Sequence, residues 1–206
     1  EGSIYKNIDI IPSHPDLIYT DMKIAVYSKP SFSSNLVSPD IYKFQILKNI
    51  LAKVEQDYDF IFIDCPPNLN YVTQNALYAS DYYLIPTILD KLSSYGILSI
   101  THKVAELNNM FSSADSAYIP TKLAGIVCNN VREYAQAPKG TQFNILADLK
   151  KVFGDAIFEN YLTYGDGIVK ASIQGYPVFG LESDANAAKQ SQLIRNIIRE
   201  LLNKMR

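Results

Sequence analysis

The stretch YDFIFIDCPPNLNYVTQNAL, residues 58–77, decides how the remaining sequence is interpreted. Its four apolar residues at 60–63 follow one another without polar alternation, and an acid, a cysteine and two prolines stand at 64–67. An uninterrupted apolar run of this kind is typical of a central parallel strand that is covered on both faces. Because proline cannot donate to a strand ladder, we predict a buried strand that ends here and places Asp64 at the carboxyl edge of a sheet.

Asp64 has two interpretations from these residues alone. A carboxylate at the carboxyl edge of a parallel sheet can hold a magnesium ion, usually through water, beside the phosphates of a nucleotide. Alternatively, the aspartate caps the following helix or closes a turn. The local sequence leaves both roles open.

The residues after Asp64 resemble the second nucleotide motif of the ParA/MinD family of deviant Walker ATPases. In that family a hydrophobic strand is followed by D-x-P-P and then by a helix that reads roughly L-x-x-x-T-x-N-A-L. The positions that fit this pattern without a gap are Asp64, Pro66, Pro67, Leu69, Thr73, Asn75, Ala76 and Leu77. The match continues along the next strand and helix at Ala79, Asp81, Ile85, Pro86 and Gly96. The similarity, which includes the partition ATPases of the Soj type, covers nearly the whole chain.

The resemblance implies an α/β fold of the P-loop NTPase (SIMIBI) type, in which a mostly parallel sheet is flanked by helices on both faces. The order of the patterns agrees with this fold, because apolar runs at 82–86 and 123–131 alternate with helical patterns at 94–110 and 143–153. A chain of 206 residues with 48% hydrophobic residues is long enough for one such domain. We therefore expect a single ParA-like domain over residues 1–206.

The P-loop of the family, which resembles K-G-G-x-G-K-[ST], has no counterpart in these 206 residues. In the family it precedes an I-P-S-x-x-x-L stretch, which this chain has at 11–17. The glycine-rich loop supplies the backbone N–H groups and the lysine that cradle the phosphates, so these residues alone are not expected to hold ATP well. We expect the C-terminal portion of a longer ATPase, without its first strand and P-loop, and the alternative is a degenerate relative.

The resemblance also assigns roles around Asp64. This residue is implied to be catalytic and to hold Mg²⁺ through water while ATP is bound. Pro66, Pro67, Thr73 and Asn75 are implied to belong to the segment that moves when ATP is hydrolysed. Both cofactors, ATP and Mg²⁺, are expectations that come from the family.

Two asparagines stand near the end of the apolar run at 123–131. A strand-end amide can bond the edge of a base because it carries a donor and an acceptor, but an asparagine here can equally form a turn. The resemblance implies an adenine contact from Asn129, with Asn130 as the near alternative. Thr163 and Tyr164 fall in the family's base-side loop, where Thr163 replaces the usual proline.

Residues 184–206 predict a closing helix that has Asp184 as its N-cap and carries an apolar stripe. Three roles are open for this helix. It can pack on the sheet with its charges in solvent, or it can bind DNA nonspecifically and in a salt-sensitive way, as the resemblance to partition ATPases implies. It can also bind a membrane as in MinD, but the negative charge of Glu200 argues against membrane binding. The residues predicted to contact DNA are Lys189, Arg195, Arg199 and Lys204. A polar loop with Arg132 and Lys139 could also touch DNA or a partner, although a solvated loop is the simpler interpretation.

The composition of the chain limits its location and its binding partners. The net charge of −2 does not indicate polyanion binding by the whole chain. No apolar run approaches the roughly 18 to 20 residues that a membrane span needs, and no secretory signal pattern opens the chain, so we expect a cytoplasmic protein. Cys65 and Cys128 lack the spacing of a metal or redox motif and are expected to be buried, reduced thiols.

The function implied by the resemblance is that of a partition ATPase. Its ATP-dependent homodimer would bind nucleoid DNA nonspecifically, and a ParB-like centromere-binding partner would stimulate hydrolysis. The alternatives are a non-catalytic ParA-like scaffold that has lost its P-loop and a MinD-like positioning ATPase.

Overall fold

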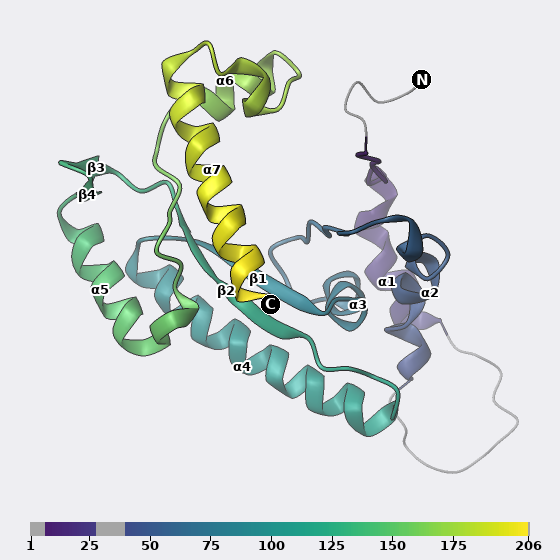
Figure 1. Cartoon of the computed structure of the whole chain (residues 1–206). Helices are drawn as coiled ribbons and strands as arrows, with labels where there is room; N and C mark the ends of the chain where they lie inside the picture. Colours follow the sequence, from purple (N-terminus) through teal and green to yellow (C-terminus); the bar gives the residue numbers. More distant parts are fainter. Residues whose placement is uncertain (1–6, 28–39, 206) are drawn as a thin grey trace, which may run out of the picture. The chain divides into compact units, whose positions relative to one another are not determined.

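The structure is a computed structural model that describes residues 7–27 and 40–205 (Figure 1). The chain divides into two units, each a compact body by itself. Residues up to Ala79 with Ser113–Ser116 form the N-terminal unit, and Ser80–Ser112 with the residues from Ala117 onward form the C-terminal unit. The expectation of one domain over residues 1–206 stays a prediction.

A parallel sheet lies at the centre of the C-terminal unit. β1 (Tyr82–Ile88) and β2 (Lys122–Asn129) pair in parallel, with Ile85 opposite Ile126. The long helix α4 (Lys91–Ala114) is the crossover that such a parallel pair requires. The strands predicted from the two apolar runs, and with them the α/β fold class, are confirmed.

A third extended segment, residues 157–163, continues this sheet along β2. Phe158 N donates to Ile126 O and Leu162 N donates to Cys128 O, each at 2.9 Å. The segment therefore runs parallel to β2, and its end lies beside the end of β2.

Helices cover both faces of the sheet (Figure 1). On one face, α4 and α5 (Thr141–Phe153) enclose a cluster that includes Ile97, Ile126 and Leu149. On the other face, α7 (Ala185–Lys204) packs through Ile197 and Leu201 on Ala124, Val127 and Phe158. The short elements of this unit are η4 (Gly154–Ala156), α6 (Gly167–Ile173) and η5 (Val178–Leu181). The predicted helices are confirmed, as is the N-cap, because the Asp184 side chain accepts from Asn186 N and Ala187 N.

The N-terminal unit contains only helices as regular elements among its described residues. They are η1 (Pro15–Tyr19), α1 (Thr20–Val26), η2 (Ile41–Lys43), α2 (Ile46–Leu51), η3 (Glu55–Asp57) and α3 (Tyr71–Ala79). A polar contact helps to hold them together, because Gln45 Nε2 donates to Tyr78 Oη and to Asp115 Oδ2, each at 3.0 Å. No helix in the described part of the chain is long and apolar enough to cross a membrane.

The prediction of a buried strand at 60–63 is wrong. The segment has no strand ladder, and 53% of Phe60, 41% of Ile61 and 76% of Phe62 is exposed. An extended segment becomes a strand only when a neighbour pairs with its backbone, and the N-terminal unit has no other strand among its described residues. Asp64 is likewise exposed after an unpaired extended segment, so it does not end a strand.

The two cysteines differ, so the expectation of two buried thiols is only half right. Cys128 is buried in β2, and burial raises the pKa of its thiol to about 11. Cys65 is exposed beside Asp64 because the strand that was to bury it does not form.

Gly125 allows the ring of Phe158 to lie directly against β2. A Cβ at position 125 would stand 2.2 Å from Phe158 Cε1 and 2.9 Å from the carbonyl oxygen of Ala156, and the φ angle of Gly125 is +153°. Gly96, in α4, is the opposite case, since nothing lies within 4 Å of the Cβ position.

Gly125→Ala is expected to destabilise the protein by about 1 to 3 kcal/mol, because the added methyl group forces Phe158 and the backbone apart. Gly96→Ala is the matched control and is expected to stabilise by up to about 1 kcal/mol through helix propensity. Urea unfolding of both variants measures this. Equal effects of the two substitutions would contradict the packing described here.

Candidate functional site

The residues predicted to contact a base meet at one edge of the C-terminal unit. Asn129 is the last residue of β2, and Val131, two positions on, forms a parallel bridge with Thr163. Tyr164 N donates to Val131 O at 2.9 Å. The carboxyl end of β2 and the loop that begins at Thr163 are therefore adjacent, as a site between them requires.

The side chain of Asn129 supports a turn through its oxygen, and its role as a base contact stays a prediction. Its Oδ1 accepts from Asn130 N at 2.8 Å, which supports a turn in which Asn130 takes a positive φ of 55°. The amide N–H groups of Asn129 have no acceptor within the described residues. The side chain is half-buried, so these donors are available to a ligand.

A cavity of about 350 Å³ opens beside Asn129. Its walls come from the end of β1 and the first turns of α4, and its lining residues are Ile85, Pro86, Thr87, Ile88, Ser93, Gly96, Ile97, Ile100 and Asn129. Isoleucine side chains dominate these walls, while Ser93, Thr87 and Asn129 supply polar atoms. Pockets with apolar walls and a few polar groups commonly bind small planar ligands.

The loop after Thr163 is held by a residue that sequence reasoning missed. Gln190 of α7 is buried, and its Nε2 donates to Thr163 O at 3.1 Å and to Gly165 O at 3.2 Å. Its Oε1 accepts from Ile168 N at 2.7 Å. The sequence signal for this role was a glutamine among the apolar positions of a predicted helix. A buried amide needs hydrogen-bond partners, so a glutamine at such a position indicates a polar contact with another segment.

Thr163 and Tyr164 differ in the exposure of their side chains. Thr163 is 4% exposed, and its carbonyl oxygen is occupied by Gln190. Tyr164 is 67% exposed and carries its ring at the surface. Of the two, Tyr164 is the one whose side chain can contact a ligand without rearrangement.

Asp64 lies in the N-terminal unit, whereas Asn129, Thr163 and Tyr164 lie in the C-terminal unit. Asp64, Pro66 and Pro67 are all exposed. Partial desolvation, and then the charge of Asp64, raise the pKa of the neighbouring Cys65 thiol. No group of three or more His, Cys, Asp or Glu side chains that could hold a metal occurs within residues 7–27 and 40–205. Asp64 presents one exposed carboxylate, a ligand type that Mg²⁺ accepts directly or through water.

The two other residues of the predicted moving segment are buried in α3. Asn75 Nδ2 donates to Lys43 O at 2.7 Å and to Tyr71 O at 2.9 Å, and its Oδ1 accepts from Leu47 N at 3.2 Å. Thr73 Oγ1 is buried without a hydrogen-bond partner in the described chain. Asn75 thus fastens α3 to η2 and α2.

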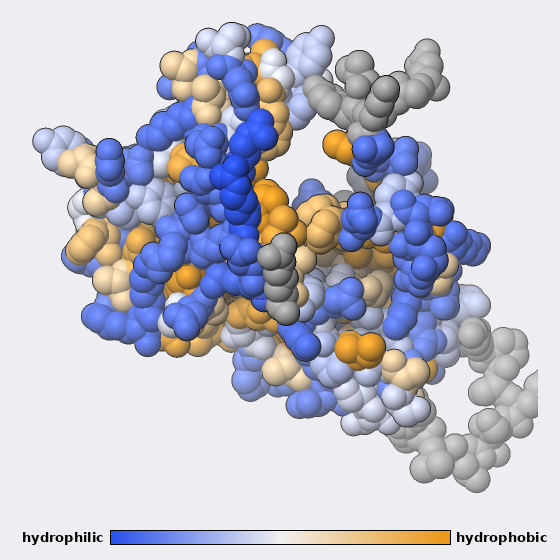
Figure 2. Space-filling model, viewed as in Figure 1, coloured by the Kyte–Doolittle hydropathy of each residue, from blue (hydrophilic) through white to orange (hydrophobic). Residues whose placement is uncertain are grey.

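The basic residues of α7 are mostly occupied by groups of the same unit. Lys189 Nζ lies 2.7 Å from Glu133 Oε2, and an Arg195 guanidinium nitrogen lies 2.8 Å from Glu182 Oε1. Arg199 donates to the amide oxygen of its neighbour Asn196 and pairs with no acid in the described chain. Figure 2 shows the hydrophilic outer surface of α7 that these residues form.

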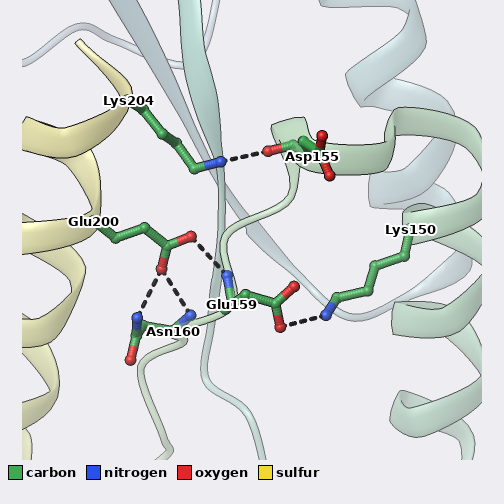
Figure 3. A network of polar contacts seen from close by, with 6 residues as sticks. All are labelled: Lys150, Asp155, Glu159, Asn160, Glu200 and Lys204. Atoms are coloured by element: carbon green, nitrogen blue, oxygen red, sulfur yellow. Dashed lines mark hydrogen bonds and ion pairs between the residues drawn. The ribbon is translucent and has the colours of Figure 1, made fainter. Parts of the chain in front are cut away.

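The end of α7 is fixed to the chain beside β2 (Figure 3). Glu200 accepts from Glu159 N at 2.8 Å, from Asn160 N at 3.0 Å and from Asn160 Nδ2 at 2.7 Å. Lys204 Nζ donates to Asp155 O, and Lys150 pairs with Glu159 at 2.7 Å. Glu200 and Lys204 therefore have structural partners, which agrees with a helix that closes the fold.

The fold and the strand-end residues place the protein in the class of α/β proteins that resemble P-loop NTPases. A family model described as an AAA domain matches residues 1–116, and the chain belongs to this family. Its relatives show that it is related to the ParA/MinD ATPases.

The relatives are similar over most of this chain. It is 25% identical over 178 residues to the sporulation initiation inhibitor protein Soj of Bacillus subtilis, covering 86% of this chain and 61% of that protein. It is 28% identical over 153 residues to the chromosome-partitioning ATPase Soj of Treponema pallidum, covering 74% of this chain and 56% of that protein. The chain thus spans less than two thirds of the length of both relatives.

A solved structure supports the fold. The McdA protein of Cyanothece, in a complex with ATP, superposes with a TM-score of 0.62 at 17% identity, covering 92% of this chain and 77% of that chain.

Asn75→Ala is expected to lower the free energy of unfolding by about 1 to 3 kcal/mol, because Leu47 N and Lys43 O lose their buried partner. Thr73→Val, on the same helix, is the control and is expected to cause no loss, since its hydroxyl has no partner. Denaturant unfolding of both variants measures the difference. A larger loss for Thr73→Val than for Asn75→Ala would contradict the assignment.

Proposed function

We propose that this chain is part of a ParA-like partition ATPase that uses ATP and Mg²⁺ to position a DNA cargo. The observation that carries the proposal is the uninterrupted match from Asp64 to Leu77, which falls within the residues matched by the family model. The homology to two Soj proteins supports it, as does the hydrogen bond from Tyr164 N to Val131 O, two residues after Asn129.

In this proposal the chain supplies the base side and the magnesium carboxylate of the nucleotide site. Asn129 donates its free amide N–H groups to the adenine edge, and Tyr164, held in place by Gln190, lies beside the base. Asp64 holds the water shell of Mg²⁺, which when bound offsets the phosphate charge. The glycine-rich loop and its lysine are not among these 206 residues, so hydrolysis is proposed for the complete protein.

The segment from Asp64 to α3 is proposed to report the state of the nucleotide. It is exposed at Pro66 and Pro67 and forms no strand ladder, whereas Asn75 anchors the helix that follows it. A change at the phosphates can therefore move residues 64–70 while α3 stays fastened to its unit. Such a change is proposed to control an ATP-dependent homodimer and its response to a ParB-like partner.

DNA binding without sequence preference, in the nucleoid-containing cytoplasm, completes the proposal. Arg199 and Lys204 are α7 cations without an acidic side-chain partner among the described residues. Lys189 and Arg195 would have to exchange their acidic partners, and Lys204 its contact with Asp155 O, for phosphates. Membrane binding in the MinD manner is not proposed.

A non-catalytic ParA-like scaffold is the alternative function. The two functions differ in whether the complete protein hydrolyses ATP with magnesium. A scaffold would tolerate loss of the Asp64 charge.

Asp64→Asn in the complete protein is expected to reduce Mg²⁺-dependent ATP hydrolysis by about a hundredfold or more, because the metal loses its carboxylate. Folding should be unaffected, since Asp64 is exposed. Asp59→Asn, an exposed aspartate just before the apolar run, is the matched control and should retain activity. Near-normal turnover of Asp64→Asn would overturn the ATPase assignment.

A further inference from the structure

The loop at residues 163–168, which leads from the sheet into α6, lies directly on the first turns of α7. Two glycines allow this close approach. A Cβ at Gly167 would stand 2.6 Å from Ala187 Cα and 2.7 Å from Ala187 N, and a Cβ at Gly165 would stand 3.2 Å from Gln190 Nε2. The loop therefore touches the backbone of α7 at one point and the Gln190 side chain at another. Figure 1 shows α6 beside the first turns of α7.

The amide of Gln190 connects three backbone groups of this loop. Its Nε2 donates to Thr163 O and to Gly165 O, and its Oε1 accepts from Ile168 N. These contacts use both N–H groups of the amide and one lone pair of its oxygen. The side chain is buried, so water does not compete for the same positions. One side chain thus sets the distance between the start and the end of the loop.

The chain before the loop is attached to α7 by a second contact. A short hairpin, formed by β3 (Glu133–Tyr134) and β4 (Ala137–Pro138), supplies it. Glu133 Oε1 accepts from Tyr161 Oη at 3.0 Å, and Glu133 Oε2 pairs with Lys189 Nζ at 2.7 Å. Burial, and then the carboxylate of Glu133, raise the pKa of Tyr161 to about 12, so this hydroxyl keeps its proton at neutral pH.

The chain after the loop is attached to α7 as well. Lys170 of α6 pairs with Asp184, the N-cap of α7, at 2.7 Å. Because α7 is held at both ends of the loop, the contacts of Gln190 act from a fixed point.

Tyr164 is placed by these contacts although it does not touch Gln190 through a printed hydrogen bond of its own. It stands between the two carbonyl groups that Gln190 binds, and its N–H donates to Val131 O at 2.9 Å. The backbone at Tyr164 is therefore fixed from the α7 side and from the β2 side, while its ring stays exposed.

We propose that Gln190 is a positioning residue that determines how well the site discriminates between nucleobases. Its amide is occupied by the loop, so it acts through Tyr164 and not on the base. Hydrogen bonds and ring contacts with a base weaken steeply when the partner is displaced, so discrimination depends on the shape of the loop. The inference rests on the proposed function, because a nucleotide gives this loop its ligand.

The simpler role for Gln190 is to fill space in the core. Gln190→Met separates the two roles, because methionine has a similar length and volume but makes none of the three hydrogen bonds. Gln192→Met is the matched control on the same helix, since Gln192 is exposed and its amide donates to Asn196 alone. Gly165→Ala is a second variant, which presses on the Gln190 amide from the loop side without removing it.

The first measurement is the steady-state hydrolysis of ATP and GTP by the complete protein. Gln190→Met is expected to raise the KM for ATP about tenfold with kcat within about twofold, because the base contacts add to binding and the phosphate contacts are unchanged. The preference for ATP over GTP in kcat/KM should fall by about tenfold. Gly165→Ala should shift both quantities in the same direction by less, and Gln192→Met should shift neither.

The second measurement needs no nucleotide. Amide hydrogen exchange of the 206-residue chain should be at least about tenfold faster at Ile168 in Gln190→Met, because this N–H loses its acceptor. The amides of β2 should exchange at an unchanged rate, which shows that the sheet is intact.

The remaining outcomes contradict the inference in distinct ways. Unchanged exchange at Ile168 in Gln190→Met would show that Gln190 does not hold the loop. Faster exchange with unchanged KM and nucleotide preference, or an equal fall in kcat for ATP and GTP at unchanged KM, would leave Gln190 a structural role only. Equal use of ATP and GTP by the unsubstituted protein would overturn the inference while the proposed function stands. No hydrolysis by the unsubstituted complete protein would overturn both.

Discussion

The parallel pairing of β1 with β2 and the continuation of the sheet by residues 157–163 are the constraint on which the C-terminal unit depends. Parallel strands bring their carboxyl ends to one edge, so Val131, two residues after Asn129, becomes the neighbour of Thr163 although the two are far apart in sequence. Helices must then cover both faces, and the two apolar clusters show that α4, α5 and α7 do so. The position of the candidate site follows from backbone hydrogen bonds before any ligand is considered.

A buried amide and a half-buried carboxylate attach irregular segments to this frame. Gln190 holds the loop after Thr163, and Glu200 holds the chain at Glu159 and Asn160. Within the N-terminal unit, Asn75 fastens α3 to η2 and α2. A buried amide or carboxylate that meets several backbone groups fixes a loop more firmly than apolar contacts do, because each lost hydrogen bond is costly. The loops that would contact a nucleotide or DNA are thus held in shape by side chains that touch neither.

The sequence was sufficient to predict the regular elements of the C-terminal unit, because β1, β2, α4 and α7 each have apolar residues at the period of the element. It failed at residues 60–63, where composition indicates a strand but burial depends on a neighbour that the segment itself does not encode. Gln190 was also missed, since its role depends on hydrogen-bond partners that lie outside its own helix. The local pattern of apolar residues predicts helices and strands. Contacts between residues distant in sequence determine which polar side chains have hydrogen-bond partners within the protein and which can bind a ligand.

The most direct test of the proposed nucleotide site is amide hydrogen exchange of the complete protein with and without Mg²⁺ and a non-hydrolysable ATP analogue. We expect slower exchange at residues 64–70, at Asn130 and Val131 and at residues 164–168, and no change when magnesium is omitted. Protection confined to other parts of the chain, or no magnesium-dependent protection at all, would contradict the account.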